Sequence, residues 1–145
     1  MLYGSKSYSF EVDSWSFGCI LAELYLGFPL LTGKNELLQI VQIAKLIGPP
    51  SEEEYQQLSG GKKDNLFNFT SKDKGMDKLL HCLPGKIFGI VESLLRYRER
   101  KPLQEIIKSE FYVEPSGPIP DLHLRTSRDK NIKLEAYEDI FGIYN

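Results

Sequence analysis

The stretch that most constrains the fold lies near the start of the chain and reads VDSWSFGCILAELYL. Its apolar side chains fall on every side of a helical wheel, a pattern typical of a helix that is buried all round. Gly27 and Pro29 follow and predict its end, because glycine tolerates the left-handed cap and proline cannot continue a helix. We therefore expect a helix over 12–26 at the centre of the core.

Four later segments also carry helical signals. Asn35 is a suitable N-cap for an amphipathic segment that runs to Gly48. A capping box, Ser51 with Glu54, predicts a short acidic helix over 51–58. A wide apolar stripe follows Pro84 and Gly85, with members Ile87, Phe88, Ile90, Val91, Leu94 and Leu95.

Pro102 suits the first turn of a last short helix, with Leu103, Ile106 and Ile107 facing inward. Residues 59–78 are polar and rich in Gly, Lys and Asp, and we interpret them as a surface insert anchored by the aromatic island LFNF. The final residues, AYEDIFGIYN, have the composition of a weak docking helix. No segment reads clearly as a strand, so the predicted fold class is all-α.

Composition excludes several classes of protein. At 145 residues the chain has the size of one ordinary domain, and a net charge of −2 argues against nucleic-acid or membrane binding through bulk charge. Cys19 and Cys82 are too few for a disulfide framework and indicate a reducing compartment. The N-terminus lacks the apolar region of a signal peptide. We expect an intracellular protein of the cytoplasm or nucleus, and interpret the sequon at Asn68 as chance.

Three blocks of the sequence, in order, resemble one family. VDSWSFGCILAEL is similar to the pattern D-x-W-S-x-G-C-x-x-A-E-L in the C-terminal lobe of eukaryotic protein kinases. GFPLLTGKNELLQIVQIAKLIGPP resembles the stretch that follows in cyclin-dependent-like kinases, and LLRYRERKPLQEIIKSEFY resembles the closing segment. In the closing block the turn before Arg100 is two residues shorter than in the family, and the family's Asp-Pro pair is missing from this sequence.

This resemblance implies a partial kinase domain over 1–112, with an insert at 59–83, and a C-terminal tail over 113–145. The parent fold is α+β, but this stretch would be the helical lower portion of its large lobe. Within the wider group of cyclin-dependent and related kinases, PLLTG and the insert look most like dual-specificity tyrosine-regulated and homeodomain-interacting kinases. Glycogen-synthase-kinase-like or cyclin-dependent-like membership is the alternative.

The family transfers the γ-phosphate of ATP, with magnesium, to protein hydroxyls, but the motifs for this chemistry are missing from the sequence. It contains no G-x-G-x-x-G, no V-A-I-K, no H-R-D and no D-F-G. The resemblance implies that the chain begins just after the A-P-E motif that ends the activation segment. We therefore expect no catalytic, cofactor-binding or metal-binding residue here, and no phosphoryl transfer by this chain alone.

Two charged residues have family roles that involve missing segments. The resemblance implies that Asp13 braces the H-R-D loop, whereas the residues alone allow a plain acid at a helix start. Without that loop we expect the surroundings of Asp13 to be wet or disordered. Arg100 would pair with the Glu of A-P-E, or else it is a surface arginine in the basic cluster of Arg96, Arg98 and Lys101.

Other positions carry weaker signals. Glu23 matches an acid that lines the peptide groove in several kinases, and it is equally a structural acid at the end of a buried helix. Trp15 and Gly18 are packing residues, Gly18 because it lets another backbone come close. Both cysteines are interpreted as buried hydrophobes rather than nucleophiles or metal ligands.

Three accounts of function follow. The chain is a piece of a serine/threonine, or dual-specificity, kinase; or it is a non-catalytic module that docks protein partners through 35–48 and the insert; or it is a decayed remnant. In each account the partners are proteins, and neither nucleic acid nor a membrane is expected.

Overall fold

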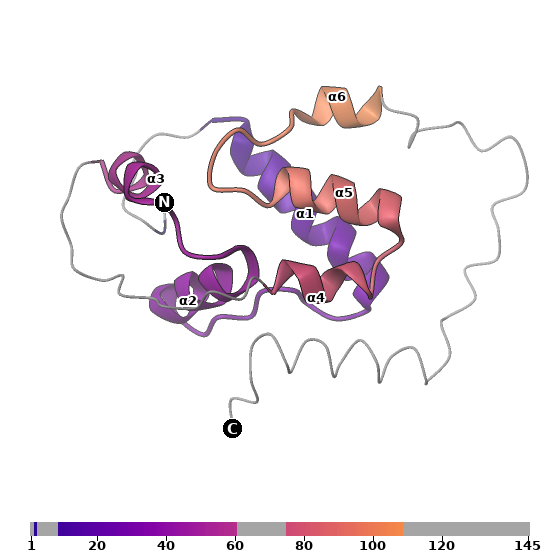
Figure 1. The fold of residues 1–145 in the computed structure, drawn as a ribbon, viewed down its shortest axis with the longest axis horizontal. Coiled ribbons are helices and arrows are strands. Elements are labelled where there is room, and N and C mark those ends of the chain that lie inside the picture. Colours follow the sequence, from indigo (N-terminus) through magenta and orange to yellow (C-terminus); the bar gives the residue numbers. More distant parts are fainter. Residues whose placement is uncertain (1, 3–8, 61–74, 109–145) are drawn as a thin grey trace, which may run out of the picture.

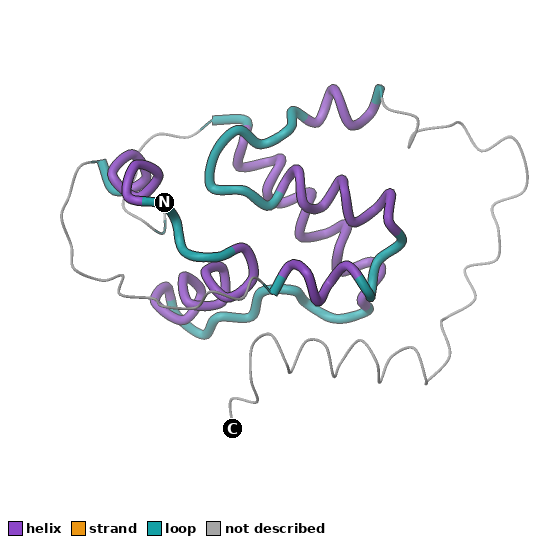
Figure 2. The backbone as a smooth tube through the Cα atoms, in the orientation of Figure 1, coloured by secondary structure: helices purple, strands orange, loops and turns teal. Residues whose placement is uncertain are grey.

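The computed structural model describes residues 2, 9–60 and 75–108, and these form a small helical body. It contains α1 (Glu11–Leu26), α2 (Glu36–Ile47), α3 (Glu52–Leu58), α4 (Met76–Leu80), α5 (Gly85–Leu94) and α6 (Leu103–Ile107). The tube in Figure 2 shows helices joined by loops, with no strand among the described residues. The all-α prediction is confirmed.

The predicted helix ends follow the local chemistry of their caps. Gly27 ends α1 with φ of 82°, in the left-handed region that favours glycine. The Asn35 side chain accepts a hydrogen bond from the Leu38 backbone N–H at the start of α2. At α3, Ser51 and Glu54 form the predicted reciprocal capping box.

The core forms where α5 packs across α1, and Figure 1 shows α4 on one side of this pair and α6 on the other. The buried cluster draws residues from both helices, from the loop after α1, from α2 and from the α4 region: Leu21, Ala22, Leu26, Leu30, Leu46, Met76, Leu79, Cys82, Leu83, Ile87, Val91 and Leu95. The stripe predicted for α5 is therefore its core face, with Phe88 and Ile90 partly buried beside it.

Two expectations about the core are wrong. α1 is not buried all round, since Ile20 is 54% exposed and Leu24 is 75% exposed, because no described element lies over their side of the helix. On α6, Ile106 is buried but Ile107 is exposed, since a helix this short presents only one narrow face.

Part of the region expected to be a surface insert lies in the core instead. α4 begins at Met76, and the side chains of Met76 and Leu79 are buried in the core because the Gly75 N–H, which donates to the Lys45 carbonyl over 2.8 Å, fixes this segment beside the end of α2. The aromatic island at 66–69, Asn68 and the C-terminal tail lie outside the described residues.

Candidate functional site

The residues with predicted family roles gather around α1 and the chain that follows α5. Gly18 of α1 packs against the end of α5: a Cβ added to it would lie 2.9 Å from Leu94 Cβ and 3.0 Å from a methyl group of Leu95. Any side chain at this position would push α5 away. The packing role predicted for Gly18 thus has a direct geometric basis, the side chains at the end of α5.

Arg100 folds back against the start of α1. Its guanidinium carbon lies 5.0 Å from the centre of the Trp15 ring, within the range of a cation–π contact. One terminal nitrogen donates to the Glu11 carbonyl over 3.1 Å, and Nε donates to the Arg96 carbonyl over 2.6 Å. Burial lowers the pKa of Arg100 from its ordinary value, and the nearby Glu11 carboxylate opposes that shift.

The turn before Arg100 brings its side chain back to the start of α1. Glu99 has φ of 53°, a left-handed conformation that few residues other than glycine adopt. The chain therefore reverses sharply, and the Lys101 N–H donates to the Ser93 carbonyl at the end of α5 over 3.1 Å. The left-handed conformation at Glu99 has no signal in the sequence, because residues other than glycine rarely adopt it.

Asp13 and Glu23 have different surroundings. Asp13 is exposed in the first turn of α1, where a carboxylate is favoured by the helix dipole, and its bracing role stays a prediction. Glu23 is partly buried, and its side chain accepts a hydrogen bond from the Leu30 N–H over 2.9 Å. This bond ties the loop after α1 to the helix; a role of Glu23 in a peptide groove stays a prediction.

Both cysteines lie among the described residues, Cys19 partly buried and Cys82 buried. Burial, reinforced by the negative charge of Glu23, raises the pKa of the Cys19 thiol to about 12, so it is protonated at neutral pH. Cys82 is buried in the core. Among the described residues, no group of three or more His, Cys, Asp or Glu could hold a metal ion.

The loop after α1 is held to α2 by two glutamines that the sequence reading did not single out. Gln39 accepts a hydrogen bond from the Gly33 N–H over 2.8 Å, and Gln42 accepts one from the Thr32 N–H over 2.7 Å. Gly33 is packed so closely that an added Cβ would lie 2.4 Å from the Gln39 backbone nitrogen. Contacts between residues six and ten positions apart follow no local sequence pattern, so the sequence held no signal for them.

Comparison with known proteins tests the family that the three motif blocks indicate. No protein-family model matches the chain. It is 34% identical over 143 residues to a probable serine/threonine-protein kinase of Arabidopsis thaliana and 31% identical over 143 residues to cyclin-dependent kinase F-1 of Oryza sativa subsp. japonica, with 96% of this chain covered in each case. The protein kinase gsk3 of Schizosaccharomyces pombe is 27% identical over 98% of the chain.

The chain belongs to the serine/threonine protein kinase family. Its relatives are cyclin-dependent and glycogen synthase kinases, and membership of the dual-specificity subfamily stays a prediction. The chain spans only 20%, 30% and 37% of the length of the three relatives above. With respect to membranes, none of the helices in the described part of this kinase-family chain is long and apolar enough to cross one.

Proposed function

We propose that the chain is the helical, C-terminal part of the large lobe of a serine/threonine protein kinase, and that it transfers no phosphate by itself. In the family as a whole, ATP and magnesium are held by groups whose motifs this sequence lacks. Phosphoryl transfer depends mainly on such positioning and electrostatic groups, so their absence removes the basis for catalysis.

The observation that carries this proposal is the outer face of α1. Ile20 and Leu24 form an exposed apolar strip one turn apart on this helix, with Asp13 also exposed at its start. The opposite side of the same helix is the centre of the core. A face of this kind is what a second half of a lobe would cover, and burial there would remove apolar surface from water.

A phosphotransfer assay tests the catalytic part of the proposal. The purified 145-residue chain is incubated with radiolabelled ATP, magnesium and a general protein substrate. We expect no transfer above a blank that lacks the chain. Magnesium-dependent transfer that scales with the amount of chain would overturn this part of the proposal.

A complementation experiment tests the structural part. The chain is co-expressed with the segment of rice cyclin-dependent kinase F-1 that precedes the matched region. We expect the two pieces to co-purify, and the paired change Ile20→Asp with Leu24→Asp to abolish this. Leu37→Asp is the matched control, because Leu37 is exposed to a similar degree as Ile20 but lies on α2. Equal loss with the control, or no association with the native chain, would contradict the proposal.

A further inference from the structure

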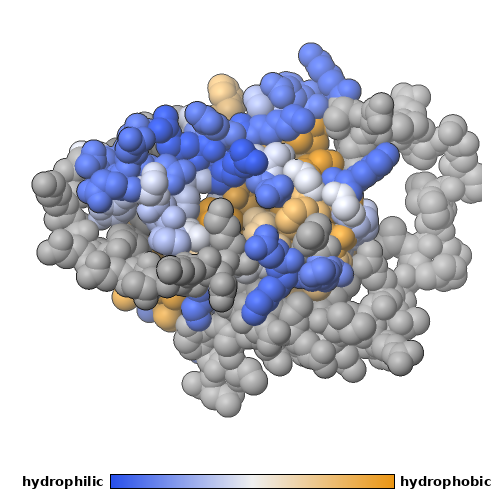
Figure 3. All heavy atoms as spheres, in the orientation of Figure 1, coloured by the Kyte–Doolittle hydropathy of each residue, from blue (hydrophilic) through white to orange (hydrophobic). Residues whose placement is uncertain are grey.

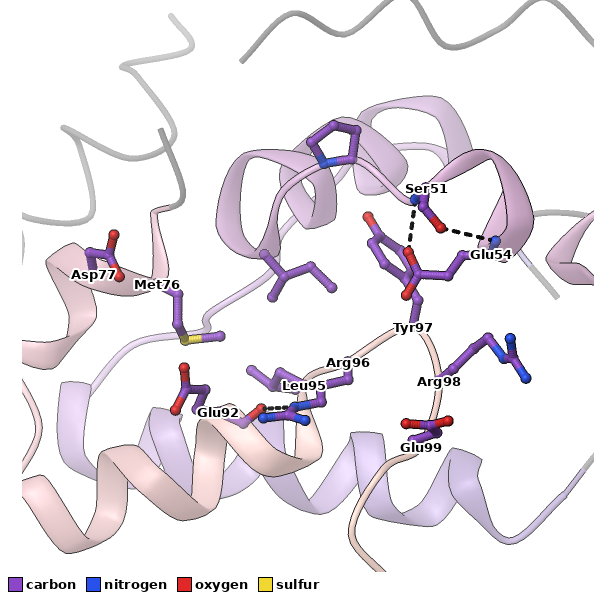
Figure 4. Close-up of a pocket in the computed structure, with 12 residues that line it drawn as sticks. Ser51, Glu54, Met76, Asp77, Glu92, Leu95, Arg96, Tyr97, Arg98 and Glu99 are labelled. Carbon is purple, nitrogen blue, oxygen red and sulfur yellow. Dashed lines mark hydrogen bonds between the residues drawn. The ribbon is translucent and has the colours of Figure 1, made fainter. Parts of the chain in front are cut away.

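A hollow of about 630 Å³ lies on another side of the molecule, away from the outer face of α1. Its walls come from five places: the end of α2 with the Pro49–Ser51 turn, Glu54 of α3, the start of α4, the end of α5, and the loop from Arg96 to Glu99. Its volume is in the range of ordinary binding pockets. Figure 4 shows the side chains of these segments converging on one space.

The base of the hollow is apolar and firmly held. Met76, Leu95 and Tyr97 are buried, and Ile47 lies beside them. The Tyr97 hydroxyl donates to the Gly48 carbonyl over 2.8 Å, which joins the loop after α5 to the end of α2. These groups are already ordered without a ligand, so little conformational entropy would be lost when one binds.

The rim of the hollow carries an excess of negative charge. Four carboxylates line it, those of Glu54, Asp77, Glu92 and Glu99, against the guanidinium groups of Arg96 and Arg98. In Figure 3, hydrophilic side chains gather over α3 and the loop between α5 and α6, with hydrophobic atoms visible beside them. The surface therefore combines an apolar base with a net acidic border.

Several of these charges are not used within the described part of the protein. Glu54 accepts from the Ser51 N–H, and Arg96 Nε donates to the Glu92 carbonyl, so these two side chains serve local structure. The carboxylates of Asp77, Glu92 and Glu99 make no hydrogen bond or ion pair among the described residues. Figure 4 places Asp77 and Glu92 on one side of the hollow and Glu99 on the other.

We propose that this hollow docks a segment of another protein that carries Lys or Arg residues on both sides of an apolar side chain. The apolar side chain would lie on Met76, Leu95 and Tyr97, and the cations would face Asp77 and Glu92 at one end and Glu99 at the other. Such charge complementarity steers association and selects the partner, while contact with the small apolar area that these side chains expose adds to the affinity. This docking is independent of phosphoryl transfer.

The test is binding of a fluorescein-labelled peptide, Gly-Lys-Lys-Leu-Phe-Lys-Lys-Gly, to the 145-residue chain, measured by fluorescence anisotropy at low ionic strength. We expect saturable binding that weakens about tenfold when Asp77→Asn and Glu92→Gln are combined. The matched control combines Glu52→Gln with Glu53→Gln, which removes the same charge from exposed positions of α3 outside the hollow. The control is expected to change binding less than about twofold.

Two further peptides complete the experiment. Replacing the Leu-Phe pair by Ser-Ser is expected to weaken binding, because the apolar contact is lost, and replacing the lysines by glutamates is expected to abolish it through repulsion. Equal weakening by both pairs of substitutions, or unchanged binding of the Ser-Ser peptide, would overturn the proposal in favour of diffuse charge attraction. Binding that requires replacement of residues 61–74 by a Gly-Ser linker would also overturn it, because the occupant would then belong to this chain.

Discussion

The two faces of α1 are made from similar residues but have opposite surroundings. Leu26 is 2% exposed in the core between α1 and α5, whereas Leu24, two positions earlier, is among the most exposed apolar side chains. The inner face therefore supports the fold of the described residues, and the outer face does not. Apolar residues on a helix therefore do not all serve the core: those on the outer face of α1 stay exposed among the described helices.

The largest expected effect comes from truncating a leucine on each face. Leu26→Ala should lower the free energy of unfolding by about 2–5 kcal/mol, because it removes buried methyl groups and leaves a cavity. Leu24→Ala should change it by less than about 0.5 kcal/mol, since that side chain already contacts water. Urea unfolding of both variants measures the difference, and equal losses would break the comparison.

A second test adds a methyl group at a glycine on each helix. Gly18→Ala should destabilise by about 1–3 kcal/mol, because the new Cβ would lie 2.9 Å from Leu94 Cβ. Gly89→Ala on α5 meets nothing within 4 Å, and alanine favours a helix over glycine, so it should stabilise by about 0.5–1 kcal/mol. Thermal unfolding of the two proteins should give shifts of opposite sign; a neutral Gly18→Ala would contradict the close packing.

The contact between Arg100 and Trp15 at the start of α1 should have a smaller effect. Arg100→Ala removes the cation–π contact and two hydrogen bonds, and should cost about 1 kcal/mol. Trp15 is the only tryptophan in the chain, so its fluorescence reports the contact directly. Arg98→Ala is the control, since Arg98 is exposed and should leave both the emission and the stability unchanged. The same spectral change in both variants would argue against the contact.

Cys19 has the smallest expected effect on stability at neutral pH. The expected effect of its burial on the reactivity of the thiol is larger. Its pKa of about 12 in the folded chain is well above an ordinary thiol value near 8.5, so alkylation by iodoacetamide at pH 8 should be at least about tenfold slower than in urea. Peptide mass spectrometry separates Cys19 from Cys82. Because the folded pKa is raised, the stability contributed by this protonated thiol is fully present below about pH 8.5 and is lost as pH rises towards 12. Equal rates in the folded and unfolded chain would contradict the burial.

Local signals in the sequence predicted most of the helices correctly. The caps at Gly27, Asn35 and Ser51 depend on neighbouring residues alone, so a sequence reading could find them. Burial depends on distant segments, and for this reason the outer face of α1 and the position of Met76 were predicted wrongly. The five residues MDKLL of α4 are too few to show a helical period. The sequence therefore offered no reason to separate them from the polar residues that precede them.

The candidate site was predictable to a lesser extent. The motif blocks singled out Asp13, Trp15, Gly18 and Arg100, whose family roles stay predictions, and the kinase family that they indicated is confirmed by the comparisons. The contact of Arg100 with Trp15 could not be predicted, because it requires the left-handed turn at Glu99. The hollow beside α4 has no sequence signature, since its walls come from five segments that meet only after folding.

The central claim is that the described helices bury one core through the inner face of α1 and leave its outer face for another part of a kinase lobe. Urea unfolding of the purified 145-residue chain, followed by far-UV circular dichroism, tests it most directly. The account predicts a single cooperative loss of helix, because one set of buried side chains joins α1, α2, α4 and α5. A broad, non-cooperative loss would contradict it, since the inner face would then need the missing cover in order to fold.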